Sequence, residues 1–307
     1  MGLRELVRRV RPGGRRFVAS RGAIIGAALA IVLVAVAVAA PALSAKDPLA
    51  SDVEHGLSPL GAPLPPSHAA VLGTDQLGRD VWARVVAGAQ TSLSIAAAAT
   101  LIALVIGLPI GLCAGYAGGS IDSALMRLVD LVLAFPVVLL AILLAALLRR
   151  SDLASSAAPV YLALGAVGWT PLARVIRGKV LMLADSDMIT AARAIGAPPA
   201  RIVLRHVLPN VAGVAVVMAS LGFAQNLLSE SVLSYLGLGA PPPAPTWGRM
   251  LYEGRVYYRT APHLVVVPGL AILLAVVAFN LIGEGLRDAL DQPAGGAGRD
   301  ADLEGAR

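Results

Sequence analysis

Charged residues and cysteine are scarce in this chain. Only 14% of its 307 residues are charged, whereas 57% are hydrophobic. Because a soluble domain carries about 25% charged residues, the composition indicates a polytopic membrane protein. Cys113 is the only cysteine, which excludes a disulfide framework and a cysteine-based metal site.

Motifs for catalysis, nucleotide binding and nucleic-acid binding are also missing from the sequence. Gly178 and Lys179 are followed by Val180, so the pattern of a phosphate-binding G-x-x-x-x-G-K-[ST] loop is not met. HExxH, GxSxG and cysteine clusters do not occur. His55 and His68 are lone histidines in a polar loop, and we interpret them as solvated. We therefore expect a chain that is not an enzyme, holds no cofactor or metal of its own, and binds no nucleic acid.

Six long apolar runs are present, and each is close to the ~20 residues that a helix needs to cross a bilayer. They predict an all-α membrane protein with six transmembrane helices, at residues 22–43, 92–116, 121–148, 160–175, 211–236 and 264–282. A signal peptide is the alternative for the first run, but its apolar region would be only ~7–15 residues long. Since this run is longer, we favour a retained span.

Residues within the runs predict how the spans pack. Three glycines recur every four residues in the second span and form a groove for a neighbouring helix, at Gly107, Gly111 and Gly115. Pro136 is expected to break the third span in its middle. Arg127 and Asp130 have the i, i+3 spacing of an ion pair on one helix face.

The polar segments divide the rest of the chain. We predict a basic arm at 1–21, a loop at 44–90, a five-helix core at 91–287 that includes the loop 185–210, and a disordered tail at 288–307. Of the 25 basic residues, 17 fall on the side of the two termini and the 185–210 loop. The positive-inside rule therefore places both termini and that loop in the cytoplasm. The net charge of +6 also indicates contact with anionic membrane lipids.

The segment 185–210 is polar but lies between two apolar runs, and it predicts two short helices around a break. Asp185, Ser186 and Asp187 are N-cap residues. Gly196 is placed to end the first helix in a left-handed conformation. Pro199 can open the second helix, and Pro209 is expected to close it. A rigid elbow of this kind, with small residues on one face and basic residues on the other, suits contact with a soluble partner.

This elbow resembles the "EAA" coupling loop of bacterial ABC-importer permeases, in which E-A-A, a three-residue spacer and glycine precede a Leu-Pro pair. Thr190 stands where the family usually has glutamate. The residues that we expect to couple to the ATPase are Thr190, Ala191, Ala192, Gly196, Ala197, Arg201, His206, Leu208 and Pro209.

Two further stretches strengthen the resemblance. The sequence LGTDQLGRD, residues 72–80, is similar to a signature of the dipeptide, oligopeptide and nickel permeases. We predict that residues 72–96 form an interfacial helix that leads into the second span. The pieces SYLGLG, PTWGRML, PGLAI and FNLIGEGLRDALD match the end of the same family. Together the resemblance covers about residues 70–291.

The resemblance implies a type I ABC-importer permease subunit in a bacterial inner membrane. It implies a second, homologous permease, two ATP-binding subunits that hold ATP and Mg²⁺, and an external substrate-binding protein. The implied substrates are di- or oligopeptides, with nickel or glutathione as the alternatives. A secondary transporter is the alternative from another class, but it would show inverted repeats with charged residues near the midplane, and we find no such symmetry.

Two smaller sets of residues complete the expected sites. A polar stripe with a spacing of four residues runs along the fifth span, at Asn226, Glu230 and Ser234. It either makes interhelical hydrogen bonds or lines the outer mouth of the translocation path. The expected contacts with the substrate-binding protein lie in the loops 44–90 and 237–263, at Ser67, Asp75, Ala244 and Trp247.

Overall fold

The computed structural model describes residues 20–150 and 152–290. This part of the chain is helical, and its only β-type pairings are two isolated bridges. The predictions for residues 1–19 and 291–307, which cover most of the basic arm and of the tail, lie outside the described residues.

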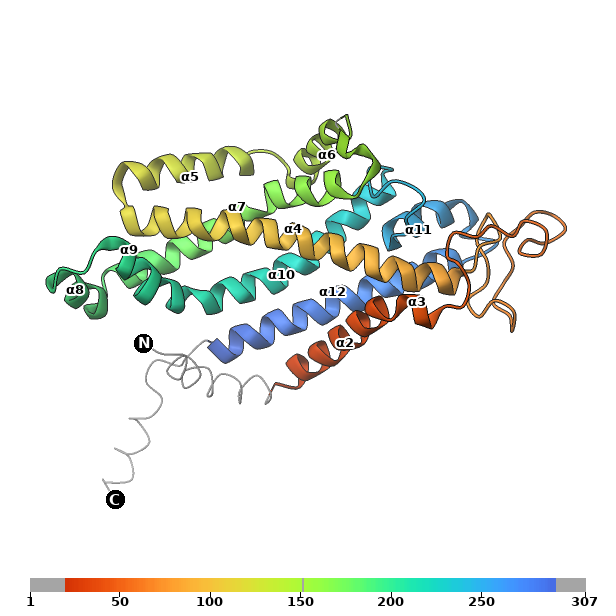
Figure 1. Ribbon diagram of the computed structural model, residues 1–307, viewed down its shortest axis with the longest axis horizontal. Helices are drawn as coiled ribbons and strands as arrows, with labels where there is room; N and C mark the ends of the chain where they lie inside the picture. Colours follow the sequence, from red (N-terminus) through yellow and green to blue (C-terminus); the bar gives the residue numbers. More distant parts are fainter. Residues whose placement is uncertain (1–19, 151, 291–307) are drawn as a thin grey trace, which may run out of the picture.

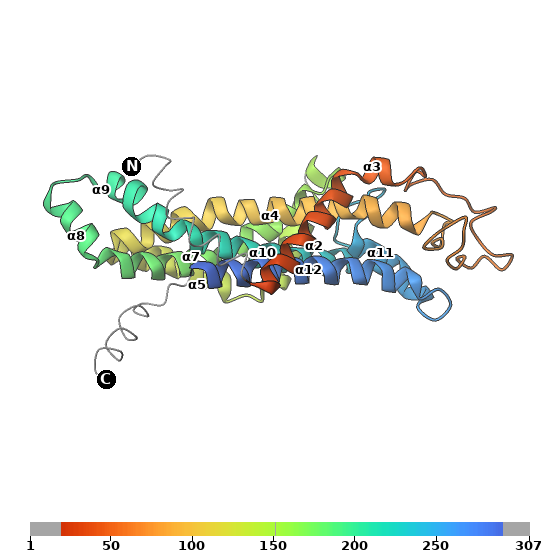
Figure 2. The same ribbon diagram turned by 90° about the horizontal axis from the view of Figure 1, so that it is seen from below.

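The helices form an elongated bundle. They are α2 (Arg21–Val38), α3 (Ala40–Leu43), α4 (Val81–Ala117), α5 (Gly119–Leu133), α6 (Val137–Leu148), α7 (Ala158–Ala184), α8 (Asp187–Ala194), α9 (Pro199–Ile202), α10 (Leu208–Tyr235), α11 (Trp247–Gly254) and α12 (His263–Leu290). Helices α8 and α9 lie at one end of the bundle, which we term the elbow end (Figure 1). The loop 44–80 and α11 lie at the other, which we term the loop end, and the view in Figure 2 shows the same separation.

Six spans are consistent with this architecture. Five helical segments are long and apolar enough to cross a membrane, namely α2, α4, α7, the continuous stretch Pro199–Tyr235, and α12. The pair α5 and α6, which meet at an angle of 86°, gives a sixth span when it is counted as one broken helix. Pro136 is the N-cap of α6, so the predicted break in the third span is confirmed.

Helices α4 and α7 pack backbone to backbone. A Cβ atom on Gly107, Gly111 or Gly115 would lie only 2.7–2.9 Å from a carbonyl oxygen of α7. The predicted glycine groove is therefore confirmed, and α7 is the helix that occupies it. A similar contact joins α2 to α12, where a Cβ on Gly26 would lie 2.8 Å from the carbonyl oxygen of Ala278.

Ion pairs hold α5 against α7. Arg177 donates from Nε and Nη2 to the two carboxylate oxygens of Asp122, at 2.5 and 2.6 Å. Arg174 donates to Asp130. The predicted pair between Arg127 and Asp130 within one helix is therefore wrong, because Asp130 faces the neighbouring helix α7 instead.

Several boundaries differ from the prediction. Helix α4 runs without interruption from Val81, so residues 72–96 do not form a separate interfacial helix. Its N-terminus is fixed by Asp80, whose side chain accepts from the backbone N–H of Ala83. Helix α7 extends to Ala184, well beyond the predicted 160–175, and Pro171 lies within it. Helix α12 continues to Leu290, so the first residues of the predicted disordered tail are helical.

Candidate functional site

The elbow is a short helix stopped by a glycine motif. Gly196 has φ of +75°, and its N–H donates to the carbonyl of Arg193 while the N–H of Ala197 donates to the carbonyl of Ala192. This pair of bonds is a Schellman motif, so the predicted left-handed C′ glycine is confirmed. No atom lies within 4 Å of the position that a Cβ would take on Gly196. The strain of a substitution here would therefore come from φ, and not from crowding within this chain.

The elbow is anchored to the end of the bundle by apolar side chains. Ile189 and Ile202 are fully buried in a cluster that also contains Ile176 and Val180 of α7. The guanidinium of Arg193 lies over the ring of Tyr116. Because both short helices contribute to this core, the elbow is attached rigidly to the spans.

Its outer face carries a groove of about 580 Å³. The lining combines small, apolar and basic side chains, namely Met188, Ala191, Ala192, Ile195, Ala197, Arg201, Arg205 and His206. Ile195 is 85% exposed, so a large apolar side chain is available at the groove for contact with a partner. Thr190 and Gly196 are exposed beside the groove but do not line it.

The second half of the elbow continues into the fifth span. Residues 203–207 form a π-turn, in which the N–H of Leu208 donates to the carbonyl of Val203. Pro209 follows at the start of α10, where its missing N–H is tolerated. The prediction that Pro209 closes the helix is therefore wrong, because the π-turn changes the hydrogen-bond register and the helix runs on to Tyr235. Movement of the elbow would thus be transmitted directly to α10.

The polar stripe on α10 lies inside the bundle. Glu230 has no exposed surface. Its carboxylate accepts from Ser92 of α4 at 3.4 Å and from Ser234 at 2.6 Å. Ser234 in turn accepts from Thr246, and Ser92 accepts from the N–H of Trp247 at the start of α11. The stripe therefore ties α10, α4 and α11 together, as the interhelical alternative describes, while a role of Glu230 or Ser234 in the path stays a prediction.

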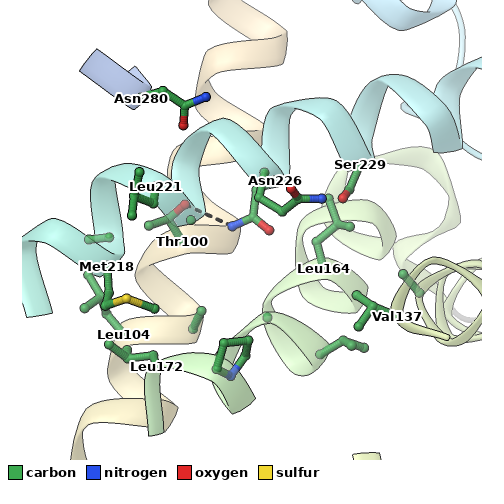
Figure 3. Close-up of a pocket in the computed structure, with 18 residues that line it drawn as sticks. Thr100, Leu104, Val137, Leu164, Leu172, Met218, Leu221, Asn226, Ser229 and Asn280 are labelled. Carbon is green, nitrogen blue, oxygen red and sulfur yellow. Dashed lines mark hydrogen bonds between the residues drawn. The ribbon is translucent and has the colours of Figure 1, made fainter. Parts of the chain in front are cut away.

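Asn226 differs from the rest of the stripe because it borders a cavity. The cavity has a volume of about 480 Å³ and lies between α4, α6, α7, α10 and α12 (Figure 3). Asn226 donates to the hydroxyl of Thr100 at 3.0 Å. The other polar residues of the lining are Gln225, Ser229 and Asn280. The polar stripe on the fifth span predicted Asn226. Thr100 and Asn280 lie on other helices, so the pattern of a single span could not reveal them.

The LGTDQLGRD stretch forms an ion-pair network at the loop end. Asp75 accepts from Arg79 at 2.7 Å and from Arg84 at 2.6 Å. Both arginines also donate to Glu253 of α11, at 3.0 and 2.9 Å. Arg249 completes the network through Glu253 at 2.8 Å. The side chain of Arg84 is only 2% exposed, so these charges connect the loop and α4 to α11 in the protein interior.

This placement changes the expected docking set. Asp75 and Trp247 are buried, and Trp247 donates from Nε1 to the carbonyl of Val85. Ser67 is exposed and Ala244 is half-buried. Asp75 and Trp247 are therefore withdrawn from the docking set, since a soluble partner cannot reach them in this arrangement.

Two family models match the chain. The model described as "Binding-protein-dependent transport system inner membrane component" matches residues 107–294. The model described as "N-terminal TM domain of oligopeptide transport permease C" matches residues 13–66. The first match contains the elbow, α11 and the cavity-lining parts of α6, α7, α10 and α12.

Curated relatives are permeases of ABC systems. The chain is 38% identical over 269 residues to the dipeptide transport system permease protein DppC of Alkalihalophilus pseudofirmus, which covers 88% of this chain and 85% of the relative. It is 45% identical over 219 residues to the glutathione transport system permease protein GsiD of Escherichia coli, with 71% of each chain covered.

The fold also matches a solved transporter. A chain of the MetNI methionine ABC transporter, in an inward-facing conformation, superposes with a TM-score of 0.55 and 21% identity, covering 68% of this chain and 97% of that chain. The shared fold is that of a type I importer permease. Taken with the family models and the relatives, this shows that the chain belongs to the inner-membrane permease components of binding-protein-dependent ABC transport systems.

Proposed function

We propose that this permease subunit imports short peptides, with a second permease, two ATP-binding subunits and an external binding protein. The dipeptide permease relative supports the peptide class. The chain itself would hold no cofactor, since ATP and Mg²⁺ would reside in the partner subunits. Its own task would be to form half of the path and to receive the movement of the ATPases.

One observation carries this proposal: the elbow presents a groove outward while its core is fixed to two spans. A soluble subunit that fills the groove could move α8 and α9 as a unit. Since the π-turn joins α9 to α10 without a break, that movement would reach the helix beside the cavity. The basic groove residues Arg201 and Arg205 also agree with a cytoplasmic elbow.

Glutathione is the second candidate substrate. It is favoured by the 45% identity to the glutathione permease relative. The two candidates can be separated in cells that express the whole system. Uptake of labelled dialanine would be measured with and without unlabelled glutathione. Inhibition of uptake at a low glutathione concentration would indicate that glutathione is a substrate.

The test of the proposal combines orientation with copurification. Cysteines would replace Ile195 at the elbow end and Leu60 at the loop end in a Cys113→Ala background; the native side chains are 85% and 96% exposed. We expect an impermeant maleimide, added outside, to label the Leu60 position and not the Ile195 position. ATP-binding subunits should copurify with the chain. The reverse labelling pattern, or a chain that purifies without ATP-binding subunits, would contradict the proposal.

A further inference from the structure

The cavity between the spans has a lining without charge. None of its 18 lining residues is Asp, Glu, Lys, Arg or His. Its volume of about 480 Å³ lies within the range of small-molecule sites. A substrate in this space would meet hydrogen-bonding groups and apolar walls, and no counter-ion.

Thr100 fixes the orientation of the Asn226 amide. The Thr100 hydroxyl donates its proton to the carbonyl of Ala96, one turn earlier on α4, at 2.8 Å. Its oxygen is therefore available as an acceptor, and Asn226 donates to it from Nδ2 at 3.0 Å. A side-chain amide has its donor and acceptor on opposite branches. With Nδ2 held by Thr100, Oδ1 must face the other way.

That other direction is the cavity. Figure 3 shows the Asn226 oxygen directed into the open space below α10. Among the described residues, none donates a hydrogen bond to Oδ1. Asn226 itself is only 7% exposed. Although the residue is buried, its fixed acceptor faces the open cavity, so Oδ1 is available to a ligand that carries a hydrogen-bond donor.

Two glycines keep the space beside this acceptor open. A Cβ on Gly222 of α10 would meet no atom within 4 Å, and one on Gly168 of α7 would lie 3.6 Å from Asn226 Oδ1. The contrast is Gly165, one turn away on α7, where a Cβ would lie 2.6 Å from the side chain of Ile102. Gly165 is therefore needed for helix packing, whereas Gly168 and Gly222 leave room for something else.

We propose that the cavity is a substrate-contact site, in which Asn226 Oδ1 accepts a hydrogen bond from an N–H of a passing peptide. The inference rests on the proposed function of peptide import. An amide N–H is common to peptides whatever their side chains. Because the lining carries no charge, this contact would not distinguish acidic, neutral and basic peptides.

The test uses the reconstituted complex of this chain with its partner subunits and binding protein in proteoliposomes, with labelled dialanine as the probe. Asn226→Leu removes the acceptor, and Thr100→Val removes the group that orients it. Each should lower the uptake rate about three- to tenfold, the effect of one neutral hydrogen bond, and by the same factor for acidic and basic dipeptides. Thr91→Val is the matched control, because Thr91 also donates to a carbonyl one turn earlier on α4 and does not line the cavity.

A second pair of variants tests the open space independently. Gly222→Leu should fill the cavity and abolish uptake while the complex still assembles. Gly178→Leu is its control, since a Cβ there also meets no atom within 4 Å but Gly178 lies outside the lining. Normal uptake by Asn226→Leu and Thr100→Val complexes, or an equal loss in Thr91→Val, would overturn the inference alone. If the wild-type complex imports neither dialanine nor glutathione, the proposed function falls, and the inference with it.

Discussion

The two ends of the bundle carry equally recognisable sequence stretches but use them in opposite ways. At the elbow end, most residues that match the coupling loop lie on the surface, although Ala192 is buried, and Ala191 and Ala197 line an outward groove. At the loop end, the charged residues of LGTDQLGRD point inward, and Asp75 and Arg84 are buried with Glu253. The elbow stretch thus shapes a contact surface, whereas the loop stretch stabilises the chain's own fold.

The glycines with positive φ at the two ends also differ in their surroundings. Gly78 in the loop has φ of +71°, and a Cβ there would lie 1.9 Å from the carbonyl oxygen of Asp52. Gly196 in the elbow has φ of +75° with open space around it. A side chain at Gly78 would clash with the loop backbone, whereas a side chain at Gly196 would meet no clash and would strain the elbow through φ alone.

The largest expected effect is at the loop end. Arg84→Met removes the more deeply buried of the two arginines that pair with Asp75 and Glu253 and leaves Arg79 alone to pair with both carboxylates. We therefore expect a loss of about 3 kcal/mol in folding stability, the lower end of the cost of breaking a buried ion pair. The measurement is the thermal unfolding of the detergent-solubilised complex. Lys46→Met is the control, because Lys46 pairs with Asp80 at a site where the lysine side chain is 56% exposed, and an exposed pair contributes about 1 kcal/mol at most. Equal losses of folding stability in the two variants would show that the buried network stabilises the fold no more than the exposed ion pair does.

The next effect is at Gly196. Gly196→Val forces a β-branched residue into positive φ at a strain of about 1–3 kcal/mol, which should distort the elbow. We expect normal membrane insertion but a low ratio of peptide imported to ATP hydrolysed. Gly61→Val is the matched control, since Gly61 also has positive φ with no atom within 4 Å of a Cβ, but lies in the loop of the opposite end. Wild-type coupling in Gly196→Val would remove the elbow from the transmission route.

A smaller effect is expected in the groove itself. Ala191→Trp should occupy part of the groove and weaken binding of the ATP-binding subunits about tenfold, which corresponds to about 1.4 kcal/mol. Ala194→Trp places the same side chain on an exposed position of α8 outside the groove. The measurement is the yield of ATP-binding subunits that copurify with each variant at increasing salt concentration. If the two variants bind equally well, the partner does not use the groove.

The smallest effect is expected at Thr190. This residue is exposed on α8, so Thr190→Glu would add at most one surface ion pair to a partner, about 0–1 kcal/mol. The same copurification assay measures it. A much larger gain in binding would mean that the site of Thr190 is buried against a basic group of the partner.

Much of the fold follows from local patterns in the sequence. The glycine spacing in α4 and Pro136 between α5 and α6 are short-range features, and they predicted the packing and the break. The left-handed Gly196 followed for the same reason, because a helix end is encoded within a few residues. Each of these three features depends on residues that lie on one helix face or within one turn.

The errors arose where distant segments meet. Residues 72–96 looked amphipathic because of Arg79 and Arg84, but those charges are neutralised by Glu253, about 170 positions later in the chain. Asp130 pairs with Arg174 across two helices, which the i, i+3 rule cannot reveal. The cavity likewise combines Thr100, Asn226 and Asn280 from three helices, so only Asn226 could be selected from sequence.

The most direct test of the account is a photo-crosslinking comparison of the two ends in the assembled transporter. A photoreactive residue would replace Ile195 in one variant and Ser67 in another, since both positions are exposed and lie at opposite ends of the bundle. We predict that Ile195 captures an ATP-binding subunit and that Ser67 captures the substrate-binding protein. Capture of an ATP-binding subunit from Ser67, or of the binding protein from Ile195, would contradict the assignment of the elbow as the coupling surface.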